Sequence, residues 1–138
     1  MICDTGAVIN GLVAGQMLHE ECLAALNAAD QLVLSPLSLC EIDYLTTNRF
    51  GYQQASRVLE ELSEPEYEIA SFDSEDLLSA IGVMETYDDL NIGLTDASLV
   101  VLAKRYRTHE ILTLDQRHFR AIRGLDGRHF KLLPYDAD

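Results

Sequence analysis

The chain has 138 residues, of which 23 are acidic and 10 are basic, for a formal net charge of −13, and 48% of them are hydrophobic. This length and composition predict a single globular domain over residues 1–138 with a sizeable core. No apolar run is long enough to span a membrane, and the first ten residues lack the basic flank of a signal peptide, so neither a transmembrane nor a secreted protein is predicted.

The cysteine pattern argues against a structural zinc site and against a disulfide framework. Cys3, Cys22 and Cys40 are odd in number, lie far apart and have apolar neighbours. Their spacing matches no zinc motif and no disulfide scaffold. We therefore expect all three to be reduced core residues of a cytoplasmic protein.

The distribution of charge is uneven. The overall negative charge argues against non-specific binding of nucleic acid. However, eight of the ten Lys and Arg residues lie in residues 104–131, whereas 18 of the 23 acidic residues precede residue 104. Part of the surface can therefore be basic. This surface is either an interface or a solvated face with a chance excess of one sign, and the sequence favours neither.

The first third of the chain predicts a strand followed by helices. Residues 1–3 are apolar and predict a buried strand with Asp4 at its carboxyl end. Residues 5–6 are expected to turn, residues 7–13 to form a short helix, and residues 16–29 to form a longer amphipathic helix.

The next strand is predicted at residues 32–34, and Ser35-Pro36 then begins a helix. Helical spacing places an apolar stripe on this helix, formed by Leu37, Cys40, Tyr44 and Leu45. Glu41 falls in the middle of that stripe. A carboxylate there is costly unless it is paired or bound to a metal. Glu41 is therefore either a metal ligand or a side chain that reaches past the core edge to water or an arginine.

The middle of the chain continues the alternation. Residues 52–62 predict an amphipathic helix and residues 67–70 a third strand. Asp73 and Ser74 signal the start of another helix. Its predicted inner face consists of Leu77, Ala80, Ile81, Met84 and Tyr87.

Residues 92–106 contain the most apolar helix of the chain, predicted at residues 95–107. Between Ala97 and Ala103 only Ser98 is polar, so this helix is expected to be buried on nearly every side. Thr95 or Asp96 can cap it. Asp96 then lies at the positive end of a buried helix, where a carboxylate stays ionised. It is either a plain cap or part of a site, depending on whether other carboxylates lie near it.

The last third predicts a strand at residues 110–114, a short helix at residues 117–122 and a final strand at residues 130–133. Asp115 follows the first of these strands. Arg117, His118 and Arg120 follow within five residues, and on a helix the two arginines would lie on one face. All three are candidates for binding the phosphate groups of a ligand. The alternative is that Arg117 pairs with an acid while Arg120 faces solvent.

The alternation of strands and helices predicts an α/β fold in which helices cover both faces of a parallel sheet. Sites in such sheets form beyond the carboxyl ends of the strands. Four acids from four elements can meet there: Asp4, Glu41, Asp96 and Asp115. Like charges this close repel unless a cation joins them. Oxygen ligands favour Mg²⁺ or Mn²⁺ over zinc, and beside a basic surface such a metal suggests phosphodiester chemistry.

Four segments resemble PIN-domain ribonucleases, above all the VapC-type toxins of bacterial toxin–antitoxin pairs. In chain order they are MICDTGAVING, SLCEIDYL, GLTDASLVVLAKRY and LTLDQRHFR. The resemblance covers essentially the whole chain. It implies a three-layer α/β/α sandwich with a five-stranded parallel sheet, and a magnesium-dependent endoribonuclease whose catalytic, metal-binding quartet is Asp4, Glu41, Asp96 and Asp115. It also implies an RNA substrate, a homodimer and a small VapB-type antitoxin. Gly6 departs from many relatives, which carry Ser or Thr there.

Three alternatives compete with this interpretation. A haloacid-dehalogenase-like phosphatase, another metal-dependent hydrolase, also begins with Asp after a strand, but it needs a second Asp at the position of Gly6. A retroviral-type nuclease fold begins with antiparallel strands, whereas the residues after Asp4 look helical. The third alternative is an inactive PIN-like module that binds RNA or protein, because a fold alone does not secure a function.

Overall fold

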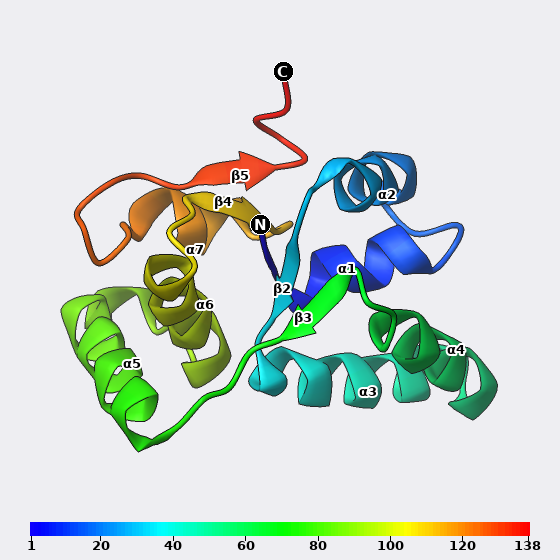
Figure 1. Ribbon diagram of the computed structural model, residues 1–138, viewed down its shortest axis with the longest axis horizontal. Helices are drawn as coiled ribbons and strands as arrows, with labels where there is room; N and C mark the ends of the chain where they lie inside the picture. Colours follow the sequence, from blue (N-terminus) through cyan, green and yellow to red (C-terminus); the bar gives the residue numbers. More distant parts are fainter.

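The computed structural model describes residues 1–138 as a sheet between two layers of helices (Figure 1). The strands are β1 (Ile2–Cys3), β2 (Leu32–Leu34), β3 (Tyr67–Ile69), β4 (Glu110–Leu112) and β5 (Lys131–Leu133). The helices are α1 (Thr5–Leu12), α2 (His19–Ala28), α3 (Pro36–Phe50), α4 (Tyr52–Leu62), α5 (Ser74–Thr86), α6 (Leu94–Arg105) and α7 (Gln116–Ala121), with a 3₁₀ turn η1 (Asp88–Leu90). None of the helices is both long and apolar enough to cross a membrane.

All five strands are parallel, in the order β3-β2-β1-β4-β5. The predicted five-stranded parallel sheet is therefore confirmed. The chain adds strands on one side of β1 first and then moves to the other side, where β4 pairs with β1. Such a switch point opens a crevice beyond the carboxyl ends of the two central strands. An all-parallel sheet also excludes the retroviral-type nuclease fold.

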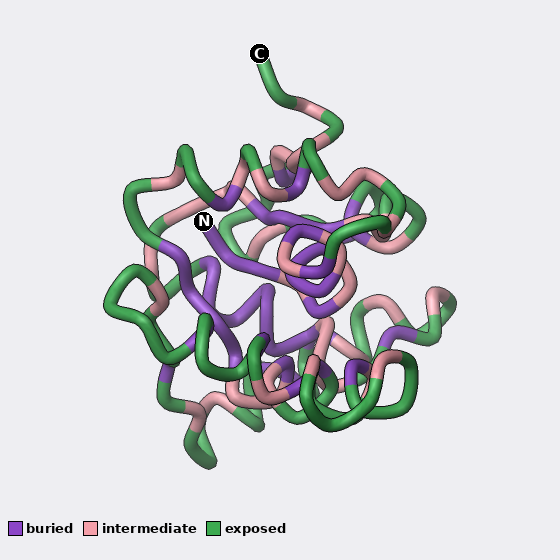
Figure 2. Tube along the Cα trace, turned by 90° about the vertical axis from the view of Figure 1, so that its right-hand side faces the viewer, coloured by how far each residue is buried: buried purple, intermediate pink, exposed green.

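Successive strand residues face opposite layers, which divides the core in two. Ile2, Val33 and Ile111 face a cluster with α5, α6 and α7. Cys3 and Leu112 face the other cluster, with α1 to α4. Figure 2 shows the buried chain concentrated between these layers. The predicted three-layer sandwich is thus confirmed, and α6 is buried continuously from Ala97 to Ala103 as expected.

The cap of α6 was predicted wrongly. The helix begins at Leu94 with Gly93 as its N-cap, and no side chain caps it. Thr95 and Asp96 therefore lie inside the first turn, and the carboxylate of Asp96 remains available to other partners. By contrast, α1 begins at Thr5, earlier than predicted, because Asp4 itself caps it.

The predicted apolar stripe on α3 is also wrong. The buried residues of this helix are Ser38, Ile42 and Thr46, whereas Tyr44 is 66% exposed. The helix buries small polar residues toward its neighbours, so apolar spacing alone does not identify the inner face. As a consequence Cys40 is exposed and is not a core residue, although Cys3 and Cys22 are buried as predicted.

The inner face of α5 was partly mispredicted. Its buried residues are Ala80 and Val83. Leu77, Leu78 and Ile81 are exposed, with Leu78 at 69%. The helix therefore carries an apolar surface that the single chain does not cover.

Candidate functional site

Asp4 is positioned by β1 and by its own capping bond. It follows Cys3 directly, and its backbone N–H donates to the carbonyl of Leu112 at 2.8 Å, which continues the pairing of β1 with β4. One carboxylate oxygen accepts from the N–H of Thr5 at 2.8 Å, and the other accepts from the hydroxyl of Thr113 at 2.7 Å. Asp4 is thereby held at the switch point of the sheet.

Thr113 links two of the predicted acids. Its hydroxyl donates to Asp4 and accepts from the backbone N–H of Asp115 at 3.0 Å. Thr113 has no exposed surface, so this arrangement is fixed by the core. Asp115 in turn caps α7 by accepting from the N–H of His118 at 3.0 Å.

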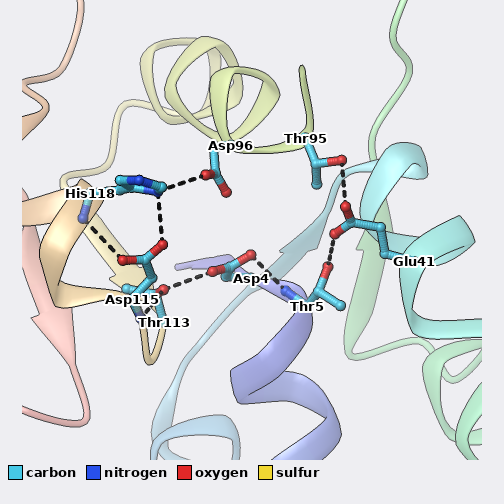
Figure 3. Close-up of polar contacts among 8 residues, drawn as sticks. All are labelled: Asp4, Thr5, Glu41, Thr95, Asp96, Thr113, Asp115 and His118. Atoms are coloured by element: carbon cyan, nitrogen blue, oxygen red, sulfur yellow. Dashed lines mark hydrogen bonds and ion pairs between the residues drawn. The ribbon is translucent and has the colours of Figure 1, made fainter. Parts of the chain in front are cut away.

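His118 lies between two carboxylates. Its Nδ1 atom is 2.9 Å from an oxygen of Asp115 and 3.3 Å from an oxygen of Asp96 (Figure 3). These three side chains offer ligand atoms that all lie within 4.8 Å of one another. Helix α6 thus brings Asp96, the N-cap of α7 brings Asp115, and α7 itself brings His118 to the same point.

Glu41 lies on the other side of Asp4, held by two threonines (Figure 3). The hydroxyl of Thr5 donates to one oxygen of Glu41 at 2.8 Å, and that of Thr95 donates to the other at 3.1 Å. Glu41 is exposed and does not lie in a core stripe, so the predicted stripe was wrong at this position, and no arginine pairs with its carboxylate. Its carboxylate faces the crevice because these hydroxyls orient it.

The first turns of α3 and α6 are tied together beneath this arrangement. The buried hydroxyl of Ser35 lies 2.8 Å from that of Ser98, and Ser98 donates to the carbonyl of Thr95 at 2.6 Å. This contact fixes the helix that carries Glu41 against the helix that carries Asp96. The single polar residue in the apolar run of α6 therefore has a structural role.

The electrostatics of the crevice are those of crowded carboxylates. Burial raises the pKa of Asp4 to about 7, with repulsion from Asp96 and Asp115 acting in the same direction and the bond from Thr113 opposing it. Burial and the charge of Asp115 also raise the pKa of Asp96, while His118 opposes that rise. A cation among these groups would relieve the repulsion.

The donor set fits a divalent cation. Asp96, Asp115 and His118 can converge on one ion, and Asp4 and Glu41 supply further oxygens beside them. Hard oxygen ligands suit Mg²⁺ or Mn²⁺, and the absence of cysteine from the cluster argues against a zinc site of the usual structural type. The four acids named from the sequence therefore gather at the same edge of the sheet (Figure 3).

The two arginines proposed for phosphate binding differ in their surroundings. Arg117 is exposed and makes no ion pair. Arg120 makes two hydrogen bonds of 2.8 Å to Asp136 and two more to Gln116, so its guanidinium is already occupied. This is the reverse of the alternative considered from the sequence, in which Arg117 was the paired residue. Arg117 is the freer of the two for a ligand.

A second basic surface lies at the other end of α6. Lys104, Arg107 and Arg128 line a cavity of about 310 Å³ together with His109, which pairs with Asp126. The first three make no ion pair, whereas Arg105 is bound to Asp76 at 2.6 Å. Three of the eight basic residues in 104–131 thus lie around one cavity, whereas Arg105 and Arg120 are paired with aspartates.

Sequence reasoning missed the threonines of the site. Thr5 and Thr95 orient the carboxylate of Glu41, and Thr113 orients that of Asp4. His118 contacts the carboxylates of Asp96 and Asp115. A usable signal was present, because each threonine lies within two residues of a predicted acid. What the sequence does not contain is the pairing: Thr5 and Thr95 serve Glu41 from other elements of the chain.

Comparison with known proteins adds family information to this geometry. The family model for the PIN domain matches residues 1–125 of the sequence. Ribonuclease VapC26 of Mycobacterium tuberculosis is 40% identical over 137 residues, which cover 97% of this chain and the whole of that protein.

Two solved structures share the fold at lower identity. The crystal structure of M. tuberculosis VapC20, described as a sarcin-ricin loop cleaving toxin, superposes with a TM-score of 0.77 at 14% identity, covering 84% of this chain and 90% of that one. A toxin–antitoxin complex from Klebsiella pneumoniae gives 0.68 at 23% identity, covering 88% and 91%.

Proposed function

The chain belongs to the PIN-domain family, and from this premise we propose that it is a metal-dependent endoribonuclease, the toxin of a type II toxin–antitoxin pair. One observation carries the proposal: carboxylates from β1, α3, α6 and the end of β4 meet at the switch point of a parallel sheet. The near-full-length similarity to a protein named ribonuclease VapC26 supports the reaction class. In this proposal Asp4, Glu41, Asp96 and Asp115 are the catalytic and metal-binding residues.

The metal is Mg²⁺ or Mn²⁺ in this proposal. When bound among the carboxylates, such a cation supplies Lewis-acid activation of water and neutralises charge at the phosphate. The residues of the chain do the rest. Thr113 holds Asp4 and the N-terminal end of α7 in register, and Thr5 and Thr95 hold both oxygens of Glu41.

Arg117 and His118 lie in the first turn of α7, directly after Asp115. We assign Arg117 to an RNA phosphate, because its guanidinium is exposed and free of carboxylate partners. Such a contact positions the strand and reads no base. Arg120 is adjacent but bound to Asp136, so we assign it a smaller contribution to RNA binding than Arg117.

Two protein partners complete the proposal. A small VapB-type antitoxin would place a basic side chain among the acids and exclude both metal and RNA, since the crevice is rich in unbalanced negative charge. The structural similarity to a toxin–antitoxin complex supports such a partner. We further propose a homodimer, supported by the uncovered apolar surface of Leu77, Leu78 and Ile81 on α5. A cytoplasmic location is part of the same proposal.

The test of the reaction is RNA cleavage by purified protein with Mg²⁺ or Mn²⁺ and with chelator. We expect cleavage only with metal, and a loss of at least about 100-fold in Asp4→Asn and in Asp96→Asn. Asp43→Asn is the matched control, because Asp43 is an exposed aspartate of α3 away from the crevice. Wild-type rates in the Asp4→Asn/Asp96→Asn double variant would refute the site, and a folded wild type inert toward RNA would favour the inactive module.

The partners are tested separately. The protein encoded by the neighbouring reading frame is co-expressed, and the purified complex is assayed for cleavage. We expect a bound and inactive complex, whereas a complex with full activity would refute inhibition at the crevice. Light scattering of Leu78→Glu tests the dimer: a monomer is expected, and an unchanged dimer would move the interface away from α5.

A further inference from the structure

His118 occupies a position that the proposed acidic quartet does not explain. Its backbone N–H caps against Asp115, while its ring turns back so that Nδ1 faces the crevice. Nδ1 is 2.9 Å from one oxygen of Asp115 and 3.3 Å from one oxygen of Asp96. This nitrogen thus lies between an oxygen of Asp96 and an oxygen of Asp115, on the far side of Asp4 from Glu41 (Figure 3).

These distances match those between neighbouring ligands of one ion. Six oxygen or nitrogen ligands at about 2.1 Å around a small divalent cation lie about 3.0 Å apart along each edge of the octahedron. The two separations of Nδ1 from the carboxylates fall on either side of that value. The three ligand atoms also lie within 4.8 Å of one another, so they are close enough to share one ion.

We propose that His118 Nδ1 is a ligand of the metal held by Asp96 and Asp115, and that this nitrogen makes the site prefer Mn²⁺ over Mg²⁺. Mg²⁺ is a hard ion that favours oxygen ligands and binds imidazole poorly. Mn²⁺ accepts carboxylates equally well and gains more from a nitrogen ligand. One imidazole among several carboxylates therefore shifts the balance from Mg²⁺ toward Mn²⁺. This inference rests on the proposed metal-dependent function.

The same two contacts would also suit a simple ion pair, in which a protonated imidazole neutralises the carboxylates and competes with the metal. The two roles predict opposite effects of removing the ring. Loss of a ligand weakens metal binding and weakens it more for Mn²⁺. Loss of a competing cation strengthens binding of both ions.

The chain offers matched variants for this comparison. His118→Leu removes every ligand atom. His118→Asn places an amide oxygen near the position of Nδ1, which keeps a ligand but changes nitrogen to oxygen. His109→Asn is the control, because His109 also pairs with an aspartate, Asp126 at 2.7 Å, but lies at the far end of α6.

The experiment measures Mn²⁺ and Mg²⁺ affinities of the full chain by titration without RNA, and records pulsed electron paramagnetic resonance of bound Mn²⁺. We expect a ¹⁴N coupling from the wild type and from His109→Asn, and none from the two His118 variants. His118→Leu should weaken Mn²⁺ binding by about 10-fold or more and Mg²⁺ binding by less than about threefold. His118→Asn should recover Mg²⁺ binding better than Mn²⁺ binding.

The failures of the two proposals are distinguishable. If the wild type binds Mn²⁺ and Asp96→Asn does not, but no nitrogen coupling is seen, the ligand role of His118 is refuted and the acidic site stands. Tighter binding of both ions by His118→Leu also refutes it, in favour of the competing cation. If wild type and Asp96→Asn have the same affinity for Mn²⁺ and the same affinity for Mg²⁺, the metal-dependent function itself is refuted.

Discussion

Replacement of Asp4 by asparagine should stabilise the metal-free protein at neutral and higher pH. Asparagine keeps the shape of the side chain and is a good N-cap, so its oxygen can accept from Thr5 while its amide donates to the hydroxyl of Thr113. The change removes a charge that burial and the neighbouring acids disfavour. Because the cap is retained and the repulsion is lost, the free energy of unfolding should increase.

The magnitude follows from the pKa of the carboxyl group. A rise from 3.8 to about 7 corresponds to about 4 kcal/mol of stability lost at pH 8. Asp4 is only partly buried, so we halve this figure for solvent screening and expect a gain of about 2 kcal/mol. For a domain of this size, that gain raises Tm by about 7 °C.

The stability gained in Asp4→Asn should also depend on pH. Because the pKa is raised in the folded state, wild-type Asp4 stays protonated and harmless at low pH and becomes destabilising as pH rises from about 4 to about 7. The advantage of Asp4→Asn should therefore be full at pH 8 and vanish below about pH 4. Thermal unfolding in chelator measures both proteins, with Asp43→Asn as control. An unchanged or lower Tm at pH 8, or a gain independent of pH, would refute the reasoning.

Three further predictions follow from the same contacts. Thr113→Val should lose about 1.5–3 kcal/mol in urea unfolding at pH 8, because an ionised Asp4 loses its donor, whereas Thr113→Ser should stay near wild type; equal losses would point to packing. Mg²⁺ at 100 times its Kd should stabilise the wild type by about 2.7 kcal/mol and Asp96→Asn by clearly less; equal responses would argue against a shared site. In a non-cleaving Asp4→Asn background, Arg117→Ala should lower the salt slope of single-stranded RNA binding by about 0.7, with little change for Arg120→Ala; the opposite order would reassign the phosphate contact.

Much of the fold follows from sequence pattern. Apolar runs that end in an acid locate β1 and β4, and their alternation with helices predicts the parallel sheet. Once the sheet is parallel, Asp4 and Asp115 must lie at the same edge, because parallel strands end together. This is why the acids of the strands were the simplest part of the site to predict.

The rest depends on packing that periodicity does not encode. The inner face of α3 buries Ser38 and Thr46 beside Ile42, so apolar spacing does not locate it and Cys40 is exposed. The start of α6 depends on a glycine cap and not on the nearby Thr95 and Asp96, the expected caps. Contacts between distant elements, such as those of Thr5 with Glu41, exist only after the helices dock.

The proposed function requires that the crowded acids at the switch point hold a divalent cation. Crystals of the protein grown with Mn²⁺ and measured for anomalous scattering test it most directly, since the peak locates the ion without assuming any activity. We expect a strong peak within bonding distance of Asp96 and Asp115 that is lost in Asp96→Asn. Ordered Mn²⁺ only at other surface acids, with none among these carboxylates, would contradict it.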